Sequence, residues 1–377
     1  MELIPIIRPT LPPLEKIVEA FQESYESGSV TLGRVVSRFE RLARAYTETR
    51  HAVAVSSCTS GLILAYAAMG LSEGAEVILP SFTFAATVQA VLWNRLTPVY
   101  VDCLPGTMAI DPGEVLKAVS PRTAAICPVT IFGLPPDFDE LERISEKHGI
   151  PLVGDSAQGL GARYKGRPTG GFGFCEVFSL SPTKVITAIE GGLIITNDGD
   201  LAKKLVAMRD YGKGPDGEDM VFNGLSARMS ELHAAVGMLS LENAKNLVDS
   251  RMRLIAKYRE VAAHFPGCRV QEFPEDRSSS GNYFTLLIGH NARANRDAVR
   301  TKLKANNIES KRYFHPPVHC QTAFKGLPHR IVGDLPNTLA ASGESLALPL
   351  FSHMTEGQLG RVCEALETVL TSKSFVT

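Results

Sequence analysis

Two side chains that could act together in catalysis stand 29 residues apart in the chain, Asp155 and Lys184. Asp155 closes an apolar run, so its carboxylate is predicted at the end of a buried strand. Lys184 follows a turn rich in serine and threonine, residues 179–183. This order suits pyridoxal phosphate (PLP), because the amine can form a Schiff base with the cofactor aldehyde and the carboxylate keeps the ring nitrogen protonated. Taken alone, Asp155 could equally be a turn or cap residue, and Lys184 a surface lysine.

A phosphate-binding turn is predicted upstream, between the first core strand and the helix that follows it. Residues 56–61 are Ser-Ser-Cys-Thr-Ser-Gly. Small hydroxyl residues at a helix N-terminus offer backbone N–H groups, side-chain donors and the positive end of the helix dipole to an anion. The alternative is an ordinary N-cap. The aspartate and lysine downstream favour phosphate binding.

An aromatic ring that could stack on a flat cofactor follows the second predicted strand. Phe82 and Phe84 are both candidates, and the residues alone do not separate them. The more common place for a phenylalanine is the hydrophobic core. Gln158, three residues after Asp155, could hydrogen-bond a ring substituent or cap the turn.

Two further segments carry polar groups that could meet a substrate. Residues 224–232 form a loop that opens into a helix, in which Ser226 or Ser230 is an expected N-cap. Arg228 in this loop could pair with an anion or a carboxylate. Residues 311–321 are rich in proline, histidine and aromatic residues, and the alternative is a proline-ordered loop with incidental histidines.

An α/β sheet is needed to position these residues, and the sequence predicts one from His51 onward. Apolar runs predict strands at 52–55, 77–79, 99–101, 124–128 and 152–154, with further strands at 177–180 and 193–196. Helical patterns lie between them at 62–69, 85–93, 112–119 and 137–148. This alternation favours a largely parallel sheet covered on both faces.

The pattern changes after Gly224. Apolar spacing predicts a long helix over 229–247 and a second helix over 252–264. A strand over 283–288, a helix over 293–306 and a closing helix over 356–370 follow. We therefore expect a large cofactor-binding domain, residues 1–250, and a smaller C-terminal domain, residues 251–377.

Composition excludes several classes of protein. The formal net charge of −1 leaves no general electrostatic footprint for nucleic acid or an anionic membrane. The first nine residues are too short and too rich in proline for a signal peptide, and no apolar run reaches the ~20 residues of a membrane span. Seven scattered cysteines show neither disulfide nor metal-ligand spacing, so we expect a cytoplasmic protein with no metal.

These motifs together resemble the DegT/DnrJ/EryC1/StrS family of sugar aminotransferases, which have PLP fold type I. The resemblance runs from residues 33–40 to the final helix. It implies an α/β fold with a mostly parallel central sheet flanked by helices and a smaller C-terminal α/β domain. It also implies these cofactor contacts: Thr59, Ser60 and Ser179 to phosphate, Phe84 stacked on the ring, Asp155 to the ring nitrogen, Gln158 to the ring oxygen and Lys184 in the Schiff base.

The same resemblance implies a homodimer with shared active sites, because the family donates the loop at 224–231 to the neighbouring subunit. The usual asparagine of that loop is Ser226 here, so Ser226 or Asn223 would reach the partner's phosphate. Cys58 replaces a glycine of the family's phosphate turn. Residues 311–321 are closest in form to enzymes acting on 4-keto-6-deoxy sugars, and the expected substrate-facing residues are Arg228, Tyr313, His315 and His319.

The function that this resemblance implies is transfer of an amino group from an amino acid, expected to be glutamate, to a nucleotide-linked keto sugar. One alternative is a PLP-dependent sugar dehydratase, in which the family replaces the lysine with histidine. Lys184 argues against it. The other is a non-catalytic regulator of the same fold. The intact pair of Asp155 and Lys184 argues against that class, as does the lack of a basic helix-turn-helix pattern.

Overall fold

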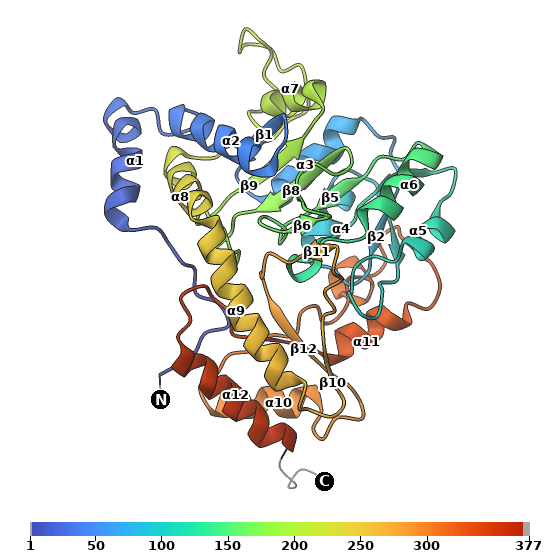
Figure 1. Cartoon of the computed structure of the whole chain (residues 1–377). Helices are drawn as coiled ribbons and strands as arrows, with labels where there is room; N and C mark the ends of the chain where they lie inside the picture. The colour runs from blue at the N-terminus through green and yellow to red at the C-terminus, as the bar shows by residue number, and fades with distance from the viewer. Residues whose placement is uncertain (1, 372–377) are drawn as a thin grey trace.

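The computed structural model describes residues 2–371, and its centre is a twisted sheet covered by helices (Figure 1). One half of the sheet has the strand order β1 (His51–Val55), β9 (Gly192–Thr196), β8 (Cys175–Ser179), β5 (Val153–Asp155). The other half has the order β13 (Arg330–Ile331), β3 (Thr97–Val101), β2 (Glu76–Pro80), β4 (Thr123–Ile126). Parallel bridges from Ile126 to Leu152 and from Val129 to Asp155 join the two halves.

Parallel pairing dominates this sheet. The strands β13, β3, β2 and β4 pair in parallel, as do β5 and β8. Strand β9 runs antiparallel to both of its neighbours, β1 and β8. Strands β2, β8 and β9 are buried along their whole length, which explains why they are continuous apolar runs in the sequence. The predicted α/β class with a mostly parallel sheet is confirmed.

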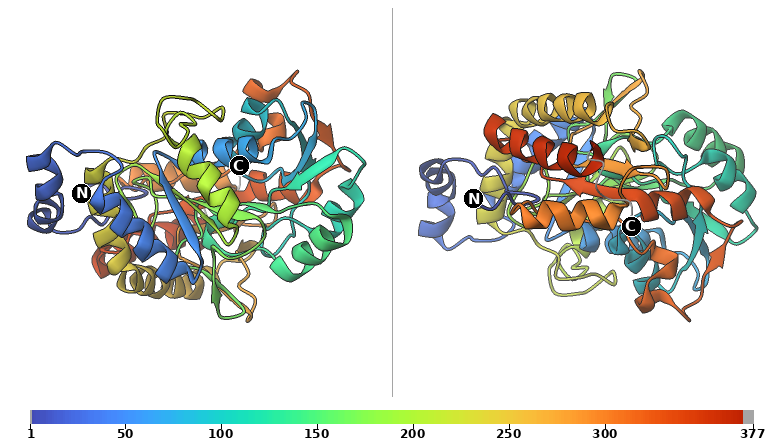
Figure 2. Two further views of the ribbon diagram at one scale, coloured as in Figure 1. Left: turned by 90° about the horizontal axis from the view of Figure 1, so that it is seen from above. Right: turned by 90° about the horizontal axis from the view of Figure 1, so that it is seen from below.

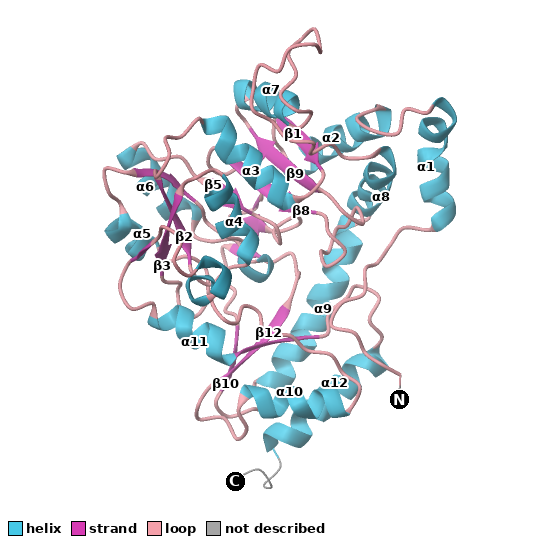
Figure 3. Ribbon diagram, turned by 180° about the vertical axis from the view of Figure 1, so that it is seen from behind, coloured by secondary structure: helices cyan, strands magenta, loops and turns pink. Residues whose placement is uncertain are grey.

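Helices cover both faces of the sheet, as Figure 3 shows from behind. On one face α3 (Cys58–Met69), α4 (Ala85–Trp93) and α7 (Gly199–Met208) share a core with the strands. On the other face α2 (Arg34–Thr47) and α8 (Glu231–Glu242) pack on β1, β8 and β9. Helices α5 (Pro112–Ala118) and α6 (Phe138–His148) pack on β2, β3 and β4. Helix α1 (Leu14–Ser27) projects from the body (Figure 2).

The C-terminal part builds a second, antiparallel sheet of β10 (Cys268–Val270), β12 (Phe284–Ile288) and β14 (Ser345–Leu348). Helices α9 (Ala244–Ala262), α10 (Arg296–Ala305) and α12 (Glu356–Thr371) enclose its core, at the bottom of Figure 1. The remaining elements are α11 (Pro336–Glu344) and the short 3-10 helices η1 (Ile131–Gly133), η2 (Val318–Cys320) and η3 (Thr322–Phe324). No helix within residues 2–371 is long and apolar enough to span a membrane.

The two parts of the chain are interlocked. Val318, Phe324 and Leu335 pack into the core around α3, and β13 pairs with β3 of the large sheet. The predicted division into residues 1–250 and 251–377 places its boundary at Arg251, which lies inside the continuous helix α9. We keep this division as a proposal.

The helices after residue 229 differ from the prediction. The expected long helix over 229–247 and the second helix over 252–264 are wrong, because the chain turns at Asn243 (φ −95°, ψ 7°) and α9 then runs unbroken to Ala262. Buried apolar residues continue on both sides of this turn, at Leu241 and Leu247, so apolar spacing does not mark the break. Helices α1 and α2 were not predicted.

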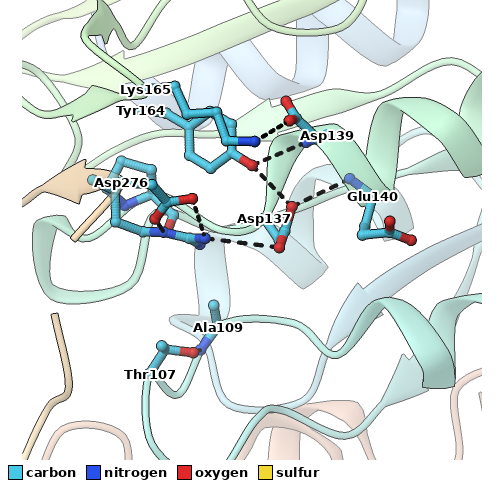
Figure 4. A network of polar contacts seen from close by, with 10 residues as sticks. Thr107, Ala109, Asp137, Asp139, Glu140, Tyr164, Lys165 and Asp276 are labelled. Atoms are coloured by element: carbon cyan, nitrogen blue, oxygen red, sulfur yellow. Dashed lines mark hydrogen bonds and ion pairs between the residues drawn. The ribbon is translucent and has the colours of Figure 1, made fainter. Parts of the chain in front are cut away.

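A small third sheet ties the C-terminal part to α6. It consists of β11 (Arg277–Ser278), β6 (Arg163–Tyr164) and β7 (Arg167–Pro168). Figure 4 shows its polar contacts: the Tyr164 hydroxyl donates to Asp137 Oδ1 at 2.9 Å, and Lys165 pairs with Asp139. Arg277 contacts both Asp276 (2.8 Å) and Asp137 (3.7 Å). These contacts fix the start of the segment that continues to Tyr283.

Candidate active site

A cavity of about 400 Å³ lies at the carboxyl ends of the strands. The residues that follow β1, β2, β4, β5 and β8 all contribute to its wall, which is where parallel sheets usually present functional groups. The predicted residues that line it are Thr59, Phe84, Asp155, Gln158, Ser179, Lys184 and Tyr313. The sheet therefore brings together residues that are up to 254 positions apart in the sequence.

Asp155 presents a buried carboxylate to this cavity. It is the last residue of β5 and is only 4% exposed. Thr87 Oγ1 donates to its Oδ2 at 2.6 Å, and the backbone N–H of Ala157 donates to its Oδ1 at 3.2 Å. Burial raises the pKa of Asp155, while these two hydrogen bonds and the charge of Lys184 oppose that rise. A cationic partner in the cavity would therefore stabilise the ionised form of this carboxylate.

Lys184 reaches the cavity from a tight turn. Its backbone N–H donates to the carbonyl of Ser181 at 3.0 Å, and the buried residues Val185 and Ile186 anchor the chain behind it. Its side chain is half-buried, and Nζ lies 5.9 Å from the ring centroid of Tyr283. The amine is therefore held at the cavity and is open to a ligand there.

The predicted phosphate turn forms the N-terminus of α3. Ser57 is the N-cap, and it exchanges hydrogen bonds with Ser60: Ser60 N donates to Ser57 Oγ (3.0 Å) and Ser57 N donates to Ser60 Oγ (3.1 Å). Ser57, Cys58 and Thr59 line the cavity, whereas the Ser60 hydroxyl is used inside the cap. A Cβ at Gly192 would meet Cys58 N at 2.7 Å, so only glycine lets β9 approach this turn.

Phe84 and Phe82 occupy different environments. Phe82 is fully buried and packs edge-on against Phe132, with 5.9 Å between the ring centroids. Phe84 precedes α4, is 58% exposed and lines the cavity. Phe84 is therefore the ring that is available to stack on a ligand.

Gln158 and Ser179 complete the polar wall. The Oε1 atom of Gln158 is buried and has no hydrogen-bond partner within residues 2–371. A buried polar atom without a partner is costly, so this atom, or the amide nitrogen after a flip, suits a ligand group. The Ser179 hydroxyl accepts from the backbone N–H of Ser181 at 3.3 Å and can still donate to a ligand.

The loop residues Asn223, Ser226 and Arg228 do not line the cavity of their own chain. Arg228 pairs with Asp210 at 2.5 Å and lies over the ring of Tyr211, 5.1 Å from its centroid. Ser226 is exposed, and Asn223 lines a separate hollow beside α3 and α7. Their predicted contact with a partner's cofactor stays a prediction.

The two histidines of the predicted sugar segment also lie outside the cavity wall. His315 Nδ1 is 3.1 Å from the hydroxyl of Ser342 in α11. His319 Nδ1 is 2.5 Å from the hydroxyl of Ser81, beside Tyr100 of β3. Tyr313 alone of the three lines the cavity, so the substrate roles of both histidines stay predictions.

Sequence analysis missed several residues of the wall. Tyr283 stands at the start of a predicted strand and belongs to no motif, whereas Lys311 opens the predicted sugar segment but is not among its expected substrate-facing residues. Thr87, which binds Asp155, is one turn into α4 and looks like an ordinary helix residue. Their positions depend on tertiary packing, which local patterns do not report.

Comparisons with known proteins agree with this fold. Residues 14–367 match the model of the DegT/DnrJ/EryC1/StrS aminotransferase family. The GDP-perosamine synthase of Caulobacter vibrioides is 34% identical over 344 residues, covering 90% of this chain and 91% of that protein. The dTDP-3-amino-3,4,6-trideoxy-alpha-D-glucose transaminase of Streptomyces venezuelae is 34% identical, covering 90% of this chain and 88% of that protein.

A solved structure extends the comparison to the backbone. The crystal structure of DesI, determined in the presence of its TDP-sugar product, superposes with a TM-score of 0.92 and 34% identity. The match covers 98% of this chain and 94% of DesI. The fold and the site define a PLP-type aminotransferase. The chain belongs to the DegT/DnrJ/EryC1/StrS aminotransferase family.

The residues of the cavity fit PLP. The buried carboxylate of Asp155 suits a ring cation, and the unpartnered Gln158 amide suits a ring oxygen. The N-terminus of α3 suits the phosphate. The glycine at position 192 lets strand β9 lie close to this N-terminus. Lys184 supplies the amine that an aldehyde requires.

Proposed function

We propose that this aminotransferase uses PLP to move an amino group from glutamate to a nucleotide-linked 4-keto-6-deoxy sugar. The observation that carries the proposal is the presence of Asp155 and Lys184 in one cavity at the carboxyl ends of the strands. The names of the relatives support a nucleotide-linked sugar, since one is a GDP-perosamine synthase and another is a dTDP-3-amino-3,4,6-trideoxy-alpha-D-glucose transaminase.

Lys184 is the proposed base. The cofactor, when bound, supplies an aldehyde carbon and an electron-withdrawing ring. With the donor and the cofactor bound, Nζ of Lys184 would move a proton between the α-carbon of the donor and the C4′ atom of the cofactor. Its half-buried position lets the amine reach the ligand while the turn at Ser181 limits its range.

Asp155 is the proposed partner of the ring nitrogen. Its carboxylate is held in place by Thr87 and by the N–H of Ala157, so it cannot swing away from the ring. An ionised carboxylate beside the ring nitrogen keeps that nitrogen protonated and the ring electron-poor.

Lys311 supports an anionic substrate. In the part of the chain that the structure describes, Lys184 and Lys311 are the two cationic side chains that line the cavity. Because Lys184 is the proposed base, Lys311 is available to bind a carboxylate of the donor or a phosphate of the sugar nucleotide. Tyr313, whose ring centroid is 5.8 Å from Lys311 Nζ, lies next to it.

We also propose a cytoplasmic homodimer in which each subunit donates the loop 224–231 to its partner's cavity. Asn223, Ser226 and Arg228 do not line the cavity of their own chain, which is consistent with a role at the cavity of a second copy. Helix α1 carries the exposed apolar side chains of Leu14 (72%) and Tyr25 (74%), which a second copy would cover. Each subunit of a symmetric dimer would give and receive the same loop.

The decisive experiment is Lys184→Ala. The purified variant should bind PLP without a covalent bond, so borohydride should fix no cofactor to the protein, and transamination should be lost. Lys203→Ala removes an exposed lysine of α7 and should be labelled and active like the wild type. Wild-type activity in Lys184→Ala would refute the assignment.

The substrate needs its own experiment. Glutamate should bleach the absorbance of the lysine-bound cofactor, and a panel of nucleotide-linked keto sugars should then restore it. Restoration by the 4-keto-6-deoxy sugars, and not by others, would support the proposed substrate. Consumption of such a sugar with loss of water, and no gain of nitrogen, would instead support a dehydratase.

A further inference from the structure

Tyr283 occupies a position in the cavity that the roles above do not explain. It is 7% exposed, it lines the cavity, and its ring is the aromatic surface that faces the amine of Lys184. The distance of 5.9 Å from Nζ to the ring centroid is within the range over which a lysine ammonium is attracted to an aromatic face.

The backbone before Tyr283 is held rigidly. Arg251 of α9 is 1% exposed, and its guanidinium donates to the carbonyls of Asn282 (3.0 Å) and Gly281 (3.4 Å). Gly281 adopts φ +70°, and a Cβ there would lie 3.1 Å from the Cβ of Arg251. Gly281 and the buried Arg251 therefore together fix the direction of the backbone that leads into Tyr283.

The large sheet holds the same segment from the other side. The Ser280 hydroxyl donates to the carbonyl of Gln158 at 2.6 Å, and Ser280 N donates to the carbonyl of Gly133 at 3.0 Å. The Tyr283 ring packs edge-on against Phe132, with 6.3 Å between centroids. The ring is thus fixed relative to the strand ends that carry the cofactor residues.

Tyr313 packs beside Tyr283 in the wall of the cavity. The two ring centroids are 4.8 Å apart, with 49° between the ring planes. Burial, and then the neighbouring Tyr283, raise the pKa of Tyr313. The group that Tyr283 offers to Lys184 is the face of its ring.

We propose that Tyr283 is a positioning residue for Lys184, a role that rests on the proposed function of that lysine. When Nζ takes the proton from the α-carbon of the donor it becomes an ammonium, and the ring face of Tyr283 holds this ammonium beside the cofactor. The same proton then passes from Nζ to C4′, and the lysine is again a neutral amine. No other atom or electron pair changes place at Tyr283.

The test begins with the full-length protein from which PLP has been removed, so that it does not depend on activity. Its lysines are dimethylated with ¹³C-formaldehyde, and the Lys184 signal is assigned by its absence from Lys184→Arg. In the wild type we expect this signal upfield of the exposed lysines, because it lies over the ring of Tyr283. Tyr283→Phe keeps the ring and should keep the shift, whereas Tyr283→Leu should return the signal to the position of the exposed lysines.

The second measurement is the half-reaction of the PLP-loaded enzyme with glutamate. A cation–π contact of this kind corresponds to about a 2- to 30-fold effect on rate, so Tyr283→Leu should slow the half-reaction by that factor and Tyr283→Phe by less. The affinity for PLP should be the same in both variants, which separates positioning of the lysine from damage to the cofactor site.

Two results would overturn the proposal for Tyr283. The first is a Lys184 signal at the position of the exposed lysines in the wild type, a result that depends on no variant of Tyr283. The second is a shift that persists in Tyr283→Leu. Borohydride trapping of PLP on Lys184 is a separate result: if it fails, the proposed function fails, whereas the signal of the cofactor-free protein still reports on Tyr283.

Discussion

Glu176 makes the stability of this protein depend on pH in a way that can be worked out from its contacts. It lies in the middle of the large sheet on β8 and is fully buried. One carboxylate oxygen accepts from the N–H groups of Gly170 (2.5 Å) and Phe172 (3.1 Å), and the other accepts from the Ser156 hydroxyl (2.5 Å). Burial raises the pKa of Glu176 from 4.5 to about 7, although these hydrogen bonds oppose the rise.

The sign of the effect follows from proton linkage. Between pH 4.5 and about 7 the folded protein holds a proton on Glu176 that the unfolded chain has released. The free energy of unfolding therefore falls as the pH rises through this window. The size of the pKa difference corresponds to about 3 kcal/mol, which is fully present below pH 4.5 and lost above pH 7.

The substitution Glu176→Gln should remove this dependence. An amide oxygen can accept from Gly170 and Phe172, and the amide nitrogen can donate to Ser156, so the contacts survive without the titrating group. Relative to the wild type, the variant should gain about 3 kcal/mol of unfolding free energy between pH 4.5 and 8. Because other groups titrate equally in both proteins, the difference between the two isolates Glu176.

The assay is urea unfolding of the cofactor-free protein at a series of pH values and one protein concentration. Glu146→Gln is a matched control, since it makes the same chemical change on an exposed side chain of α6 and should follow the wild type at every pH. A difference between Glu176→Gln and the wild type that stays constant with pH would show that the carboxylate does not titrate in this window, and the reasoning would be refuted.

Three further predictions concern the cavity. Thr87→Val removes the hydroxyl that donates to Asp155, and a hydrogen bond to a charged group is worth about 1.5–3 kcal/mol. The loss disfavours the ionised carboxylate, so the acid limb of the pH–rate profile should move up by about 1–2 pH units. An acid limb that does not move would count against the contact between Thr87 and Asp155. Asp155→Asn should still bind PLP but should form the amino form of the cofactor much more slowly in stopped-flow spectra; rates equal to the wild type would reduce Asp155 to a turn residue. Mixing Lys184→Ala with Arg228→Ala should restore some activity, because one site of each mixed dimer would be intact; verified mixed dimers without activity would argue against shared sites.

The parts of the fold that could be predicted are those in which burial is uniform along an element. Strands β2, β8 and β9 are buried throughout, and helix α4 begins and ends at the predicted residues, Ala85 and Trp93. The break between α8 and α9 could not be predicted, because Asn243 turns the chain without interrupting the apolar surface. A single backbone angle, rather than composition, decides it.

The site shows the same limit. Asp155 and Lys184 could be predicted from the sequence, because a charged group at the end of an apolar run, or after a tight turn, is unusual. Phe84 could be chosen over Phe82 only through the family resemblance, since the two phenylalanines have the same local chemistry. Tyr283 could not be found, because its place beside Lys184 results from a contact between segments that are 99 residues apart.

The short strand β13 has a consequence for any attempt to shorten the chain. It supplies two residues, Arg330 and Ile331, to the open edge of β3. Arg330 also pairs at 2.6 Å with Glu76, a carboxylate with no exposed surface. A fragment that ends at residue 250 would leave β3 as an unprotected edge strand and Glu76 with Arg122 as its remaining ionic partner. The exposed edge of β3 could form hydrogen bonds with strands of other chains, so we expect the truncated protein to self-associate.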